Sequence, residues 1–96
     1  MKSYRDLIVW QESIKLVKSV YVISQEFPKE EIFSLTNQLR RAVVSIPSNI
    51  AEGQRRRTSK DFLQFVQIAF GSAAEVDTQI EIAYQLGYIN ILTPQI

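Results

Sequence analysis

The stretch that decides the fold is residues 38–53, QLRRAVVSIPSNIAEG. Its apolar residues recur every three or four positions, which is the spacing of one face of an α-helix. The full stripe starts a little upstream and comprises Ile32, Leu35, Leu39, Ala42, Ile46 and Ile50. Pro47 interrupts it at a cost of about 3 kcal/mol, through a lost hydrogen bond and a ring clash. Because the stripe keeps its phase across Pro47, we expect one kinked, continuous helix rather than a stop and a restart capped by Asn49.

The limits of this helix follow from the residues at its two ends. It should begin near residues 30–32, because Glu30 and Glu31 suit the positive end of a helix dipole. Gly53 is a natural exit, since glycine readily adopts the left-handed conformation that ends many helices.

Two further amphipathic helices flank this one. The first is predicted over residues 7–27, where Pro28 disfavours continuation. The second should be capped by Thr58 or Ser59 and end at Gly87. The first carries two apolar stripes, Leu7, Trp10, Ile14, Val17 and Tyr21 beside Val9, Leu16 and Ile23. The second also carries two, Phe62, Phe65, Ala69, Ser72, Val76, Ile80 and Ala83 beside Leu63, Val66, Phe70 and Ala73. Both helices should therefore be covered on two sides.

Three helices joined by short turns predict an all-α, antiparallel up-down bundle that occupies residues 1–96 as a single domain. Thr93 followed by Pro94 is the usual opening of a fourth helix, of which only the start precedes Ile96. Without the rest of that helix an apolar groove would remain. We therefore expect the protein to self-associate.

The composition excludes most enzyme chemistry. The 96 residues include no cysteine and no histidine, so Ser-His and Cys-His nucleophile systems cannot be built. We predict no enzyme and no cofactor. The apolar runs are far shorter than a bilayer span, and the first residues lack a signal-peptide core. A cytoplasmic protein that does not enter a membrane is the expectation.

Positive charge is concentrated between residues 40 and 60. This segment holds six of the eleven basic residues, Arg40, Arg41, Arg55, Arg56, Arg57 and Lys60, against the single acid Glu52. The chain after Lys60 carries no cation and four acids, Asp61, Glu75, Asp77 and Glu81. The formal net charge of +1 hides this asymmetry, which concerns partners rather than fold.

The basic residues allow two interpretations. Arg55, Arg56, Arg57 and Lys60 lie in or beside a predicted loop, where they either bind the phosphates of RNA or DNA or simply keep the loop solvated. The loop has no aromatic residue for base stacking, which argues against sequence-specific reading. Arg41 should pair with Glu75 inside the bundle, whereas Arg40 is the better candidate for a partner.

Polar residues form a stripe on each of two helices. The stripes are Ser45, Asn49 and Glu52 on one helix and Ser72, Glu75 and Gln79 on the other. They could line a ligand or metal pocket, but Glu52 and Glu75 lie at different heights, so we predict no metal site. We favour a structural network, including Arg41, that sets which helix faces which. Farther along, Tyr84 and Tyr88 fit either a hinge before a fourth helix or an exposed contact surface.

The chain resembles the four-helix bundle family of 23S ribosomal RNA intervening-sequence proteins. The segments that carry the resemblance are residues 6–11, 38–53, 62–65, 71–75, 78–79 and 86–89. The resemblance implies an antiparallel four-helix bundle. A related branch, the accessory variability determinant of diversity-generating retroelements, forms a pentamer, works with a reverse transcriptase and binds nucleic acid through a basic surface.

Two hypotheses follow from the residues and the resemblance together. The first is a non-enzymatic, self-associating bundle, pentameric if it follows the related branch, whose basic loop binds RNA or DNA phosphates. The second is a homo-oligomeric scaffold that docks a protein such as a polymerase and has no nucleic-acid role. They differ in whether arginines or exposed apolar residues are needed for the functional complex.

Overall fold

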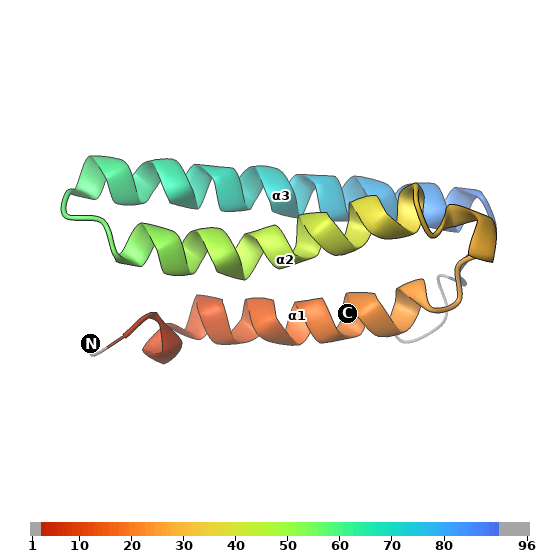
Figure 1. The fold of residues 1–96 in the computed structure, drawn as a ribbon, viewed down its shortest axis with the longest axis horizontal. Helices are drawn as coiled ribbons and strands as arrows, with labels where there is room; N and C mark the ends of the chain where they lie inside the picture. The colour runs from red at the N-terminus through yellow and green to blue at the C-terminus, as the bar shows by residue number, and fades with distance from the viewer. Residues whose placement is uncertain (1–2, 91–96) are drawn as a thin grey trace.

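The computed structural model describes residues 3–90 of the chain. It contains three α-helices, α1 (Ile8–Ser24), α2 (Leu35–Gln54) and α3 (Ser59–Gln85). Short 3-10 helices, η1 (Tyr4–Asp6) and η2 (Lys29–Glu31), precede α1 and α2. The helices run antiparallel in a bundle 44 Å long, with α2 between α1 and α3 (Figure 1). The predicted all-α up-down arrangement is confirmed, and no strand occurs within residues 3–90.

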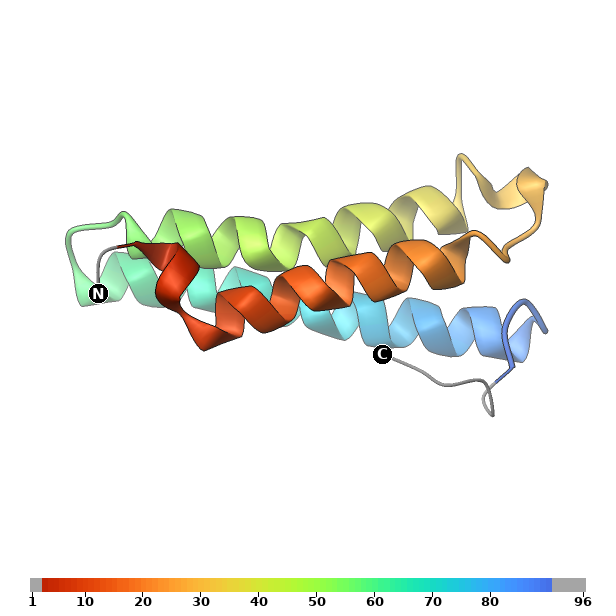
Figure 2. The ribbon, with the colours of Figure 1, turned by 90° about the horizontal axis from the view of Figure 1, so that it is seen from below.

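The core is built around α2, which packs against both other helices. Seen from below, α1 crosses in front of α2 and α3 (Figure 2). The three largest fully buried side chains are Leu39, Val20 and Val43. One cluster of buried residues joins the helices: Val20, Phe27, Leu35, Leu39, Ala42, Val43, Ile46, Ile50, Ala69, Val76 and Ala83. The predicted stripe of α2 is thus the core face, except for Ile32, which is exposed.

The start of α2 differs from the prediction. The chain first makes the η2 turn, and α2 begins at Leu35 rather than near residues 30–32. The reason is the carboxylate of Glu31, which accepts bonds from the Ser34 hydroxyl at 2.6 Å and the Leu35 amide at 3.3 Å. Glu31 therefore caps the helix from outside instead of lying within its first turn.

Helix α2 continues through Pro47 without a break, as predicted. Two side chains next to the proline bond to the backbone one turn earlier. The Ser48 hydroxyl donates to the Val44 carbonyl at 2.9 Å, and the Asn49 amide donates to the Ser45 carbonyl at 2.8 Å. These bonds supply donors in the region where the proline lacks an N–H.

Gly53 does not end α2, so that prediction was wrong. The helix extends to Gln54, and Arg55 at its end keeps a right-handed conformation. Gly53 is buried because α3 passes very close to it. A Cβ atom there would lie 2.9 Å from the Cβ of Phe65 and 3.3 Å from the carbonyl oxygen of Phe62. The glycine is needed for this close approach and not for a turn.

Both predicted ends of α3 are confirmed. The Thr58 hydroxyl accepts a bond from the Asp61 amide at 3.1 Å, which is an N-cap. At the other end Gly87 has a φ of +80°. The Gly87 amide bonds to the Tyr84 carbonyl at 3.0 Å and the Tyr88 amide to the Ala83 carbonyl at 2.9 Å. This pair of bonds is the Schellman motif. The predicted fourth helix at Thr93-Pro94 lies outside the described residues.

The bundle end that holds Gly87 is closed by a contact between distant segments. The Tyr88 hydroxyl donates to the Glu31 carboxylate at 2.6 Å, and the Tyr88 ring lies 5.6 Å from that of Phe27. Bonds from Ser34 and Tyr88 lower the pKa of Glu31, and the same carboxylate raises the pKa of Tyr88. Tyr88 is half-buried and bonded, so it is neither a free hinge nor an exposed surface residue.

Candidate nucleic-acid interface

The basic residues that are close in sequence form two groups in space. Arg55, Arg56 and Arg57 lie in the turn between α2 and α3, with Lys60 in the first turn of α3. We call these four residues the basic turn. Arg40 and Arg41 lie earlier in α2, about 22 Å along the axis at 1.5 Å per residue. These six basic residues therefore lie in two places, four at the α2–α3 turn and two along α2, and Figure 1 shows that turn at one end of the bundle.

Three of the four basic-turn residues face solvent without a carboxylate partner. Arg55, Arg57 and Lys60 are exposed, and none forms a salt bridge within residues 3–90. None of the four arginine or lysine side chains is paired with a carboxylate of α3. The turn thus keeps free positive charge at the tip of the bundle.

Arg56 differs from its neighbours because its guanidinium is held. Its Nη2 lies 2.6 Å from Oε1 of Glu52, and its guanidinium carbon lies 4.6 Å from the centre of the Phe65 ring. An i, i+4 pair at the surface contributes about 0.3–0.5 kcal/mol. Glu52 therefore offsets one of the four positive charges and orients Arg56 across the turn.

Arg40 is used inside the bundle. Its Nε donates to the Ser24 hydroxyl at 2.7 Å, and its guanidinium carbon lies 4.8 Å from the centre of the Tyr21 ring. The side chain is only partly exposed and joins α2 to α1. This placement does not favour the prediction that Arg40 is free for a phosphate.

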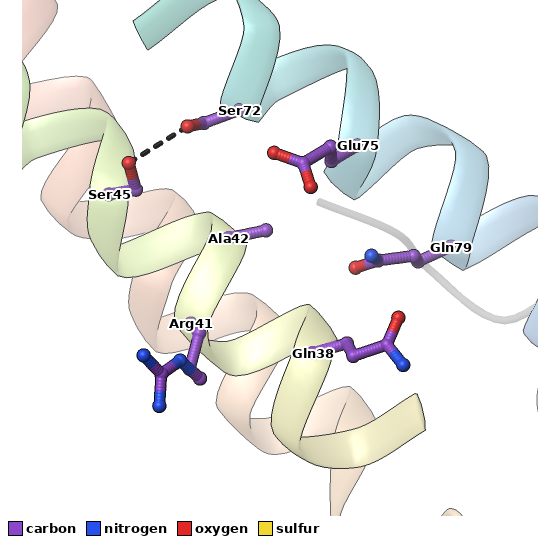
Figure 3. A pocket seen from close by; sticks show the side chains of 7 residues that line it. All are labelled: Gln38, Arg41, Ala42, Ser45, Ser72, Glu75 and Gln79. Carbon is purple, nitrogen blue, oxygen red and sulfur yellow. Dashed lines mark hydrogen bonds between the residues drawn. The ribbon is translucent and has the colours of Figure 1, made fainter. Parts of the chain in front are cut away.

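The expected pair of Arg41 and Glu75 is wrong. Both residues line a pocket of about 280 Å³ between α2 and α3, but within residues 3–90 no salt bridge joins them. Figure 3 shows the Arg41 side chain turned away from Glu75. The antiparallel heights of the two residues were estimated well, whereas the direction of the guanidinium could not be read from spacing.

Part of the predicted polar network is present. The Ser72 hydroxyl donates to the Ser45 hydroxyl at 2.8 Å, and the Asn49 amide donates to the same oxygen at 2.9 Å (Figure 3 shows the first bond). Glu52 instead pairs with Arg56. Buried polar side chains need such partners, so these bonds fix the register of α2 against α3. Three predicted members, Arg41, Glu75 and Gln79, line the pocket next to this network.

The α2–α3 pocket is lined mainly by polar side chains, and among the described residues that line it only Glu75 carries a carboxylate. The Gln79 Oε1 atom is buried and has no hydrogen-bond partner among the described residues. Within residues 3–90 no three acidic side chains gather as ligands. The arrangement is therefore best understood as helix packing beside a small polar cavity.

Among the described helices, none is long and apolar enough to cross a bilayer.

Comparison with protein families gives one result that covers nearly the whole fold. The family model described as 23S rRNA-intervening sequence protein matches residues 5–93. The chain belongs to this family. The resemblance predicted from the sequence is confirmed, and the match includes all three helices and the basic turn. Comparison with curated proteins gives no match.

One feature of this 23S rRNA-intervening sequence family member was missed by sequence reasoning. Phe33, in the loop before α2, is 91% exposed. It lines a pocket of about 600 Å³ between α1 and α2, together with Tyr21 and both arginines of α2. The signal was present, because Ile32 and Phe33 are adjacent and two successive residues cannot both lie on one core stripe.

Proposed function

We propose that this protein is a non-enzymatic, self-associating helical bundle that binds RNA or DNA phosphates through its basic turn. The observation that carries the proposal is the exposure of Arg55, Arg57 and Lys60, none of which forms a salt bridge with a carboxylate within residues 3–90. Such cations attract a polyanion because binding releases counterions condensed on the nucleic acid. The absence of an aromatic side chain in residues 55–60 favours contact with the backbone over base reading.

The proposal gives a quantitative expectation for salt. If three side chains each neutralise one phosphate of a single strand, the logarithm of the binding constant falls with the logarithm of salt concentration at a slope of about −2. Binding should therefore be measured with an unstructured, single-stranded RNA over a series of salt concentrations, after nuclease treatment of the protein.

A matched pair of variants tests the residues. Arg55→Ala with Arg57→Ala should weaken binding at low salt and reduce the slope to about −0.7, because one free cation remains. Lys18→Ala with Lys29→Ala removes the same charge from exposed positions on α1 and η2 and should leave binding nearly unchanged. No binding at low salt, or equal affinities for the two double variants, would contradict the phosphate role.

A scaffold that docks another protein, such as a polymerase, is the second candidate. The observation in its favour is the number of large apolar side chains exposed on a small bundle, including Ile8, Val22, Phe33 and Phe70. Exposed apolar side chains mark protein contacts where they gather into one patch. This candidate requires that substitutions at such positions, and not those in the basic turn, abolish the functional complex.

A further inference from the structure

The pocket between α1 and α2 has the composition of a protein contact site. We call it the α1–α2 pocket; its main walls are Tyr21, Ile32, Phe33, Arg40, Arg41 and Val44. It measures about 600 Å³, and among the described residues no carboxylate lines it. Exposed aromatic residues together with arginine are enriched at the centres of protein interfaces. An occupant should therefore be apolar and negatively charged.

A surface of that character lies on α3 of the same chain. Ile68, Glu75 and Ile82 follow one another at seven-residue intervals, so they form one stripe along the helix. All three are exposed, and Leu86 extends the stripe by one turn. Glu75 forms no salt bridge within residues 3–90. We call these four residues the α3 stripe.

The two surfaces lie on neighbouring sides of α2, because Arg41 lines both the α1–α2 pocket and the pocket that holds Glu75. Within one molecule the Arg41 side chain is nevertheless turned away from Glu75 (Figure 3). The stripe lies beside the pocket that α2 and α3 form, whereas the α1–α2 pocket opens on the side of α2 that faces α1. Each has charges that the described part of the chain leaves unpaired, and the charges are opposite in sign. Complementary charges and exposed apolar side chains on both surfaces favour contact between two copies.

We infer that the α3 stripe of one copy docks in the α1–α2 pocket of a second copy. This inference rests on the self-association that forms part of the proposed function, and it specifies the surfaces that meet. Since the two surfaces differ, the contact is head-to-tail, and such contacts close into a ring when the rotation between copies permits.

The heights of the residues agree with this contact. The Ser45–Ser72 bond sets the register, so four residues back along α2 Arg41 stands level with Val76, next to Glu75. By the same count Leu35, the first residue of α2 and two residues after Phe33, stands level with Ile82. Rotation about an axis parallel to the bundle preserves these heights. Arg41 of one copy then meets Glu75 of the second, and Phe33 meets Ile82 and Leu86.

Two single variants and their mixture test the docking. Phe33→Glu places a charge against the apolar side chains of Ile82 and Leu86 of the second copy. Ile82→Lys places a charge on the stripe against the Phe33 ring of the second copy. Each variant should raise the dissociation constant of assembly by about 30-fold or more, which is the effect of losing a central interface residue. Solution mass, measured on nuclease-treated protein, should fall toward the 11.1 kDa of one chain.

The mixture distinguishes a head-to-tail contact from other modes. The Phe33→Glu chain keeps an intact stripe and the Ile82→Lys chain keeps an intact pocket, so the two chains should pair through this contact. At the other contact the two introduced charges are opposite in sign and face each other, so the mixture should recover the assembly that each variant loses alone. Val22→Glu, an equivalent change at an exposed position of α1 outside both surfaces, should leave the mass of the assembly unchanged. Circular dichroism should show the same helix content in all variants.

The contrary outcomes have separate meanings. An assembled wild-type protein whose mass is unaffected by Phe33→Glu or by Ile82→Lys would overturn the docking and leave self-association standing. Single variants that lose assembly but do not pair in the mixture would also overturn it. A wild-type protein that is monomeric throughout would overturn both the docking and the self-association.

Discussion

The two ends of the bundle use charged side chains in opposite ways. At the α2–α3 turn, Arg55 and Arg57 extend into solvent with no salt bridge in the described part of the chain. At the other end, Glu31 accepts bonds from Ser34, the Leu35 amide and Tyr88. One end is closed by its charge, whereas the other leaves its charge available. The difference shows that charge in the sequence indicates function only after internal partners have been subtracted.

The same contrast holds between Arg40 in α2 and Arg55 in the turn that follows this helix. Arg40 lies against Ser24 and Tyr21, and so contributes to the packing of α1 on α2. Arg55 forms no salt bridge within residues 3–90 and is exposed. We therefore expect substitution of Arg40 to lower the stability of the fold, and substitution of Arg55 to weaken nucleic-acid binding.

The largest change in the free energy of unfolding is expected from Gly53→Ala, at the end of the bundle that holds the α2–α3 turn. The added Cβ would lie 2.9 Å from the Cβ of Phe65, so α3 has to move. Overpacking of this kind costs about 1–3 kcal/mol of unfolding free energy. Gly71→Ala is the matched control, because Gly71 is exposed in α3 with nothing within 4 Å. It should stabilise by about 0.5–1 kcal/mol, as alanine favours helix over glycine. Urea unfolding of both variants measures the contrast, and equal values would disprove the close-approach role.

At the closed end, Tyr88→Phe should lower the melting temperature by a smaller amount. The change removes the hydroxyl that donates to Glu31 but keeps the ring beside Phe27. Tyr84→Phe is the control, since Tyr84 is exposed and its hydroxyl is not bonded to Glu31. If both variants have the same melting temperature as the parent protein, the Tyr88 hydrogen bond does not stabilise this end of the bundle.

The pH dependence of stability should come from the closed end. The pKa of Glu31 is lower in the folded protein, so its contribution is complete above the ordinary value of 4.5 and is lost as pH falls through the folded pKa. The pKa of Tyr88 is raised, so its contribution is complete below 10.0 and is lost as pH rises through the folded pKa. Urea midpoints from pH 2 to pH 6 should show a shallower decline for Glu31→Gln than for Glu30→Gln.

The smallest effect on stability is expected from Arg55→Ala with Arg57→Ala. Exposed substitutions away from packed features usually change the unfolding free energy by less than about 0.5 kcal/mol. The same variant should show the largest loss of RNA affinity, measured as described above. A large loss of stability would mean that the arginines have an internal structural role, and the contrast between the two ends would disappear.

The fold was predictable because apolar spacing alone identifies helices and their core faces. Leu39 and Ile46 illustrate this, as both belong to the predicted stripe of α2 and both are buried. Local caps were also predictable where one residue decides the geometry, as at Thr58 and Gly87. Gly53 was misread because a glycine that ends a helix and a glycine that admits a neighbouring helix look alike in sequence.

The candidate site was predictable only in part. The exposed positions of Arg55 and Arg57 follow from a short polar turn, which the sequence identifies. The direction of a long side chain does not follow from spacing, since it depends on which acceptor lies within reach. Arg40 donates a hydrogen bond to Ser24, sixteen positions away in sequence, and the Arg41 side chain is turned away from Glu75. Phe33 was missed because its exposure depends on where η2 ends and α2 begins.

Pro47 interrupts the backbone hydrogen bonding of α2 although the helix is continuous. The helix is continuous, yet the proline offers no amide proton to the Val43 carbonyl one turn before it. Opening motions that travel along a hydrogen-bonded ladder should therefore stop at this position. The two halves of α2 can then exchange their amide protons with solvent as separate blocks, one moving with the arginine-rich turn and the other with the closed end.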